Sequence, residues 1–166
     1  MFRFFSAALA SITKSILFPG PVSVPYSVVT DIGNYPLFLD GCEKVEVLAS
    51  APIEESDKKD SRDGSESVTA RITVGFGGHT YEMTTRNHNR HLESVSMVML
   101  SGPFESFKGE WSFTSYGAQG CQIDIDISYV VSGLLGKAIK LVQGKIVDKT
   151  VSVSYTHLRA HETDRY

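Results

Sequence analysis

The chain has 166 residues, of which 42% are hydrophobic and 21% are charged, and its formal net charge is −3. A chain of this length can bury a sizeable core as one domain, and its composition excludes the disordered, collagen-like and disulfide-scaffold classes. The slightly acidic balance also excludes a global attraction to nucleic acid, so any such contact must be local.

Two cysteines, Cys42 and Cys121, lie far apart, and neither has a second cysteine at metal-binding spacing. This pattern argues against a disulfide framework and a zinc site, and it fits a reducing compartment.

The first twelve residues are interpreted as an N-terminal extension. They carry one basic residue, Arg3, and an Ala8-Leu9-Ala10 that resembles a signal-peptidase site. The apolar run is shorter than a usual signal-peptide core, so secretion is the weaker interpretation. An organelle presequence remains an alternative because no acidic residue precedes Asp31. No stretch of the sequence is long enough to span a bilayer.

A short strand is predicted from Thr13 to Phe18, and Pro19-Gly20-Pro21 then breaks it. Apolar residues at helical spacing predict a helix from Ser23 to Ile32, with Ser23 as its N-cap. A second helical turn follows at Tyr35–Leu39 and ends near Gly41. Two short helices are therefore expected after the first strand.

Residues 53–67 contain a polar stretch without apolar side chains to bury, and this stretch predicts a flexible, solvated loop. The segments that follow alternate between apolar and polar residues, as half-buried strands do. They are Val68–Phe76, His79–Asn87, Glu93–Leu100, Gly109–Tyr116 and Gln122–Val131. Glycine-containing turns separate them, so we expect an antiparallel meander.

From Leu134 to about Val151 the apolar period becomes helical, with one stripe that includes Ile139 and Val142. The apolar face of the sheet can be buried if this long helix lies across it. The expected fold is therefore α+β of the helix-grip type over residues 13–152. A curved antiparallel sheet of about six or seven strands wraps a long C-terminal helix.

The tail, residues 153–166, is interpreted separately. Val153–Thr163 match the translation, in one frame, of a transposon adapter used in sequencing libraries. We interpret the tail as an assembly artefact, and we expect the natural gene to continue past about Val151. His157 and His161 have the spacing of a helical metal pair, and we set them aside for this reason.

Several separated motifs occur in an order and spacing typical of a known family. They are Asp31–Leu39 with Cys42, Thr84-Thr85-Arg86-Asn87, Gly102-Pro103-Phe104, Gly109–Phe113 and Cys121. Together they resemble the coenzyme Q-binding START-domain family of START/Bet v-like proteins, and Thr84–Asn87 is most similar to its bacterial RatA branch. The chain departs from the family at Gly41, where Trp is common, at Pro25 inside the first helix, and in its longer polar loop.

The resemblance implies a cavity between sheet and helix that holds a polyprenyl quinone such as ubiquinone. The leading hypothesis is a non-enzymatic protein without a resident cofactor that binds this lipid, or another hydrophobic small molecule, in support of respiration. One alternative is a RatA-type toxin that binds the large ribosomal subunit and blocks subunit association. A second is a cyclase or hydrolase on the same fold. We expect a bacterial cytoplasmic location with transient membrane-surface contact, and the alternative is mitochondrial.

The predicted ligand-binding residues are those that should line such a cavity, although core packing explains most of them equally well. They are Tyr35, Phe38, Leu39, Phe76, Arg86, Phe104, Phe107, Trp111, Phe113, Ile139 and Val142.

Among polar residues, Arg86 and Asn87 can hydrogen-bond quinone oxygens or phosphate. For Arg86, a cross-strand ion pair with Glu82 or Glu93 is an equally good explanation.

No catalytic or metal-binding residue is predicted. His88 and His91 have a spacing that can ligate metal, but these two ligands alone do not complete a metal site. Asp124 and Asp126 share the polar face of one strand, where solvation is expected to leave carboxylates without the perturbation that catalysis needs.

Overall fold

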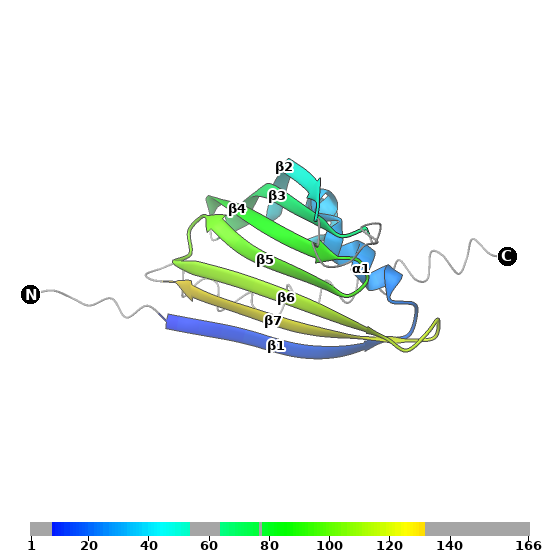
Figure 1. Cartoon of the computed structure of the whole chain (residues 1–166). Coiled ribbons are helices and arrows are strands. Elements are labelled where there is room, and N and C mark those ends of the chain that lie inside the picture. Colours follow the sequence, from blue (N-terminus) through cyan, green and yellow to red (C-terminus); the bar gives the residue numbers. More distant parts are fainter. Residues whose placement is uncertain (1–7, 54–63, 77, 132–166) are drawn as a thin grey trace, which may run out of the picture.

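The computed structural model of the chain describes residues 8–53, 64–76 and 78–131. Seven antiparallel strands form one sheet in the order β1-β7-β6-β5-β4-β3-β2. Figure 1 shows it as a single twisted layer running from β1 to β2. The strands are β1 Ala8–Phe18, β2 Cys42–Pro52, β3 Glu66–Phe76, β4 His79–Arg90, β5 Ser94–Ser101, β6 Ser106–Ser115 and β7 Cys121–Val131.

Three short helical segments connect β1 to β2: α1 (Ser23–Thr30), the 3-10 helix η1 (Ile32–Asn34) and α2 (Tyr35–Phe38). In Figure 1 they lie behind β3 and β4, on one side of the sheet. The two expected short helices are thus confirmed, with α1 ending at Thr30 rather than Ile32. Ser23 is the first helical residue and Val22 the cap, so the predicted Ser23 N-cap is wrong. Pro25 stays in the first turn, where its missing N–H leaves no helical bond unmade.

The predicted meander is confirmed, with two differences at its ends. Strand β1 begins at Ala8 instead of Thr13, because residues 8–12 pair with β7 up to Val131. Part of the expected N-terminal extension therefore belongs to the sheet. Strand β2 has no counterpart among the predicted strands. It lies at the edge of the sheet, where most of its side chains are exposed, and register shifts at Cys42/Lys44 and Val47/Ala49 break its alternation.

The register defines two faces of the sheet. The inner face is the one against which the helical segments pack, and β7 contributes Ile123, Ile125, Ile127 and Tyr129 to it, all buried. The outer face carries the intervening residues of β7, such as Asp124 and Asp126. The predicted alternation in β7 is confirmed, and so is that of β3, where Val68, Ala70 and Ile72 are buried.

The predicted long helix, with Ile139 and Val142, lies outside the described residues, as do residues 54–63 of the polar loop and the tail. Among the described residues, no helix is long and apolar enough to cross a membrane.

Candidate functional site

The inner face carries two groups of buried apolar side chains. The first lies on β1, β5, β6, β7 and α1, and the second on β2, β3, β5 and η1. Phe107 and Trp111, both on β6, pack against both groups. These two predicted ligand residues therefore occupy the centre of the inner face.

Trp111 lies across the sheet because its neighbour on the same face is a glycine. A Cβ placed on Gly109 would approach two ring carbons of Trp111, Cζ3 and Cη2, to 2.8 and 3.0 Å. The indole therefore covers Gly109, which pairs with Met97 on β5. Met97 in turn pairs with Asn87 on β4, so the ring tip lies in the cross-strand row that contains Asn87.

Aromatic rings extend from Trp111 toward one end of the sheet. Phe104 contacts Phe107 at a centroid distance of 5.3 Å and Tyr129 edge-on at 5.6 Å. Toward the other end, Phe113 is buried and contacts Tyr26 of α1 edge-on at 5.5 Å. Trp111 and Phe113 share the inner face, since they pair with Ile125 and Ile123 of β7.

The predicted residues of the helical segments lie beside the second group. Tyr35 and Leu39 pack against it, and Phe38 meets Tyr35 edge-on at 5.5 Å. The Tyr35 hydroxyl donates a 2.6 Å hydrogen bond to the carbonyl oxygen of Val29. Burial, with smaller contributions from Cys42 and Asp31, raises the pKa of Tyr35 well above its ordinary value. Tyr35 is thus a neutral donor that fastens α2 to α1.

A row of polar side chains crosses this apolar face. Thr85, Asn87 and Asn89 alternate along β4 on the inner side and are 0%, 2% and 1% exposed. Within the described part of the chain, Thr85 Oγ1 and the Oδ1 atoms of Asn87 and Asn89 have no hydrogen-bond partner. Buried polar atoms are nearly always hydrogen-bonded, so three such orphans in one row are unusual. We call these three residues the polar row.

Glu66 fixes one end of the polar row. Asn89 Nδ2 donates to Glu66 Oε1 at 3.3 Å, and the Ser50 hydroxyl donates to Glu66 Oε2 at 3.0 Å. A carboxylate only accepts hydrogen bonds, so the Asn89 amide must turn its nitrogen toward Glu66. Its oxygen is then left as a buried acceptor.

Sequence reasoning singled out Asn87 but missed Thr85 and Asn89. Every residue from Thr84 to Arg90 is polar, so the sequence has no hydrophobic contrast that would tell one face of β4 from the other. Arg86 lies between these residues on the exposed outer face, opposite to Trp111. It therefore does not line the inner face with Asn87. Its suggested partner Glu82 pairs with Arg71 at 3.2 Å.

Three predicted site residues fall outside this description. The backbone of Phe76 ends β3, while its side chain is not among the described ones. Ile139 and Val142 lie beyond the described residues, and their contact with a ligand stays a prediction.

The two buried thiols and the Tyr129 phenol of the inner face stay protonated at neutral pH. Burial raises the pKa of Cys121 and of Tyr129, and it raises that of Cys42 against a backbone hydrogen bond. On the outer face, hydrogen bonds from Ser15 and Gln122 lower the pKa of Asp124. The two thiols and the Tyr129 phenol are therefore not general bases near pH 7, and the carboxylate of Glu66 at the inner face accepts hydrogen bonds from Asn89 and Ser50.

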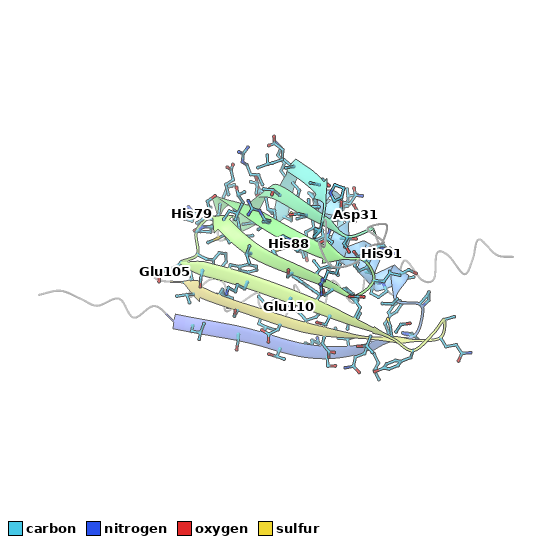
Figure 2. The ribbon with its side chains drawn as sticks, viewed as in Figure 1. Asp31, His79, His88, His91, Glu105 and Glu110 are labelled. Carbon is cyan, nitrogen blue, oxygen red and sulfur yellow. The ribbon has the colours of Figure 1, made fainter. Side chains whose placement is uncertain are left out.

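Figure 2 shows the labelled histidines and acidic residues spread over the sheet. His79 and Glu105 lie at one end, His91 lies at the other, and His88 and Glu110 lie between. Among the described residues, no three His, Cys, Asp or Glu side chains gather as metal ligands would.

Comparison with known proteins identifies one family and one group of relatives. Residues 18–152 match the family described as polyketide cyclase / dehydrase and lipid transport. A ribosome association toxin RatA of Pseudomonas aeruginosa is 32% identical over 127 residues, covering 76% of this chain and 79% of that protein. RatA of Escherichia coli strain K12 is 27% identical over 145 residues, covering 87% and 82%.

Solved structures agree on the fold. The Zhui aromatase/cyclase of Streptomyces sp. R1128 superposes with a TM-score of 0.69 at 15% identity, over 93% of this chain and 98% of that one. A START superfamily protein of Mycobacterium smegmatis gives a TM-score of 0.57 at 15% identity, over 87% and 93%. At these identities the likeness establishes a START-like fold.

Proposed function

Since the chain belongs to the polyketide cyclase/dehydrase and lipid transport family, we propose that it is a non-enzymatic binding protein for a hydrophobic ligand of the polyprenyl-quinone type. The ligand lies against the inner face of the sheet, in a bacterial cytoplasm. The observation that carries the proposal is the inner face itself, where a buried polar row is embedded in a face of apolar and aromatic side chains. Ligand sites combine such an apolar lining with a few polar groups that orient the ligand.

The arrangement suits an elongated molecule with a polar head. Phe104, Phe107 and Trp111 offer apolar contact to an isoprenoid tail, whose burial contributes about 25 cal/mol for each square ångström removed from water. The polar row lies on the same face on β4, separated from β6 by β5, and provides hydrogen-bonding groups for the head.

A binding role also accords with the protonation of the inner face. A cyclase on this fold would need a base close to its substrate, whereas the raised pKa values of Cys42, Cys121 and Tyr129 keep these groups protonated at neutral pH. The carboxylate of Glu66 already accepts hydrogen bonds from Asn89 and Ser50. We therefore propose no catalytic step.

The proposal is tested by mass spectrometry of an organic extract of the purified protein. We expect a polyprenyl quinone in near-stoichiometric amount, and its loss from Trp111→Asp. The matched control is Val98→Asp, since Val98 lies on the outer face and is 36% exposed. Circular dichroism establishes that both variants are folded. A folded wild-type protein with an empty extract would refute the proposal.

A second candidate function is ribosome association, which the name of the RatA relatives favours, and we propose the large subunit as the partner. On the outer face Arg86 and Lys108 flank Val98 across three adjacent strands, and all three are exposed. Co-sedimentation with isolated 50S subunits should weaken steeply with salt, as contacts with phosphates do. Sedimentation that does not depend on salt would argue against this use of Arg86 and Lys108.

A further inference from the structure

The chemistry of the polar row is more specific than a general preference for a polar head group. Each member is almost fully buried, and the row lies among the apolar side chains of the inner face, on a strand that pairs with both β3 and β5. An unpaired buried polar atom destabilises the folded state, because it has lost its hydrogen bonds to water and gained none in the protein. Three such atoms on one face lower the stability of the unliganded protein, and a ligand that hydrogen-bonds to them restores it.

At the Asn89 end of the polar row, the structure determines which atom donates a hydrogen bond and which atom accepts one. Because Asn89 Nδ2 is held by Glu66, Asn89 Oδ1 can only accept a hydrogen bond. Asn87 has an unpaired Oδ1 as well, and Thr85 carries a hydroxyl that donates or accepts. The ligand group opposite Asn89 must therefore be a donor, such as a hydroxyl.

The spacing of the row fits a ring with oxygens at both ends. Residues two apart on a strand are separated by about 7 Å. A head group that lies along β4 can thus place one oxygen near Asn89 and another near Asn87 or Thr85. The edge of Trp111 lies in the same cross-strand row as Asn87, where it can contact the face of such a ring.

We propose that Thr85, Asn87 and Asn89, oriented by Glu66, select a hydroxylated head group, so that the protein binds a reduced quinol in preference to the oxidised quinone. This inference rests on the proposed function and specifies which redox form it concerns. A quinol presents two O–H donors, whereas a quinone presents only acceptors, which leave Asn89 Oδ1 unpaired.

The test is an equilibrium titration of the full chain with decylubiquinol and with decylubiquinone under anaerobic conditions. Trp111 is the single tryptophan, so its fluorescence reports on ligand at the inner face. We expect the quinol to bind at least tenfold more tightly. A tenfold preference raises the midpoint potential of the bound pair by about 30 mV, which redox titration measures independently.

Three variants separate recognition from folding. Asn89→Leu should reduce the preference to less than about threefold. Glu66→Gln should also weaken the preference for the quinol. A glutamine amide can donate a hydrogen bond to Asn89 Oδ1, which allows the Asn89 amide to adopt the flipped orientation. His88→Leu is the matched control, since His88 lies between the two asparagines but is exposed on the outer face. This control should keep the full preference.

The thermal stability of the unliganded protein gives a second readout. A row that only supports the fold loses stability on substitution, whereas removing an orphaned polar atom should raise the Tm of Asn87→Leu by about 2–4 °C. Equal affinity for both redox forms would overturn the inference while leaving quinone binding intact. Binding of neither form would overturn both.

Discussion

At the scale of single residues, Gly109 decides how the indole of Trp111 lies on the sheet. A β-carbon at this position would come within 2.8 Å of the ring. The ring has little freedom to move because it packs between two apolar groups. A methyl group would therefore lift the indole from the inner face.

We predict that Gly109→Ala destabilises the protein by about 1–3 kcal/mol, as overpacking of a core does. The substitution should also weaken the binding of decylubiquinone, measured by quenching of Trp111 fluorescence, at least fivefold. Denaturant unfolding and the quinone titration measure the two effects. Gly33→Ala is the control, because a Cβ there meets nothing within 4 Å. An unchanged titration would show that the position of the indole does not matter for binding.

Tyr35 links α2 to the end of α1 through its hydroxyl. We predict that Tyr35→Phe costs about 1 kcal/mol at pH 7, because the bond to the Val29 carbonyl is lost. The folded pKa of Tyr35 is raised, so its contribution is complete below the unfolded value of about 10 and is lost as the pH rises toward the folded value.

The stability difference between wild type and Tyr35→Phe should therefore shrink as unfolding is measured from pH 9 to pH 11. In the control, Tyr116→Phe, the phenol is exposed and bonds to Gln122, and the change should stay within about 0.5 kcal/mol. A difference that stays constant with pH would contradict the raised pKa of Tyr35 in the folded protein.

The burial of Thr85 and Asn89 in the polar row could not be predicted from the sequence. The inner positions of β6 and β7 were predictable because Trp111, Phe113 and Ile123 alternate with polar residues. On β4 both faces are polar, so the burial of Asn89 depends on its pairing with Val95 and Glu66, which the sequence does not reveal. The same pairing places Arg86 on the outer face, away from Trp111.

At the scale of elements, strands β7 and β2 differ in how many neighbouring strands pair with them. Strand β7 pairs along its whole length with β1 and along most of it with β6, and its alternate residues are buried. Strand β2 pairs only with β3, and large apolar side chains such as Val47 and Leu48 remain 49% and 42% exposed. The regular strands were predictable from alternation, whereas β2 was not, because its register shifts disrupt that pattern.

We predict that amide hydrogens of β7 exchange at least a hundredfold more slowly than those of β2, because strands secured on both sides open only in larger unfolding events. Hydrogen exchange read by mass spectrometry on peptides of the two strands measures the ratio. Comparable protection in both would contradict the assignment of β2 as a weakly held edge.

At the scale of the whole molecule, the two faces of the sheet have different chemistry. The inner face is apolar with one polar row, and the outer face carries charged side chains such as Arg86, Lys108 and Asp126. The two proposed functions therefore use different residues. The START-like fold was predictable from motifs spread along the chain. Which polar residues lie on each face of the sheet was not predictable, since that depends on cross-strand register.

We predict that the two faces can be impaired separately. The double change Arg86→Glu and Lys108→Glu should reduce co-sedimentation with 50S subunits at least tenfold at low salt, because it reverses two charges that can meet phosphates. It should leave the lipid content of the organic extract unchanged. Loss of both properties in a folded double variant would show that the faces are not independent.

The central claim, that the inner face of the sheet holds the ligand, is tested most directly by photoaffinity labelling of the full chain with an azidoquinone, followed by peptide mapping. The account predicts labelling on the inner residues of β4, β5 and β6, near Asn87, Met97 and Trp111, and competition by decylubiquinol. Labelling confined to outer-face residues such as Val98, or labelling that excess quinol does not displace, would contradict it.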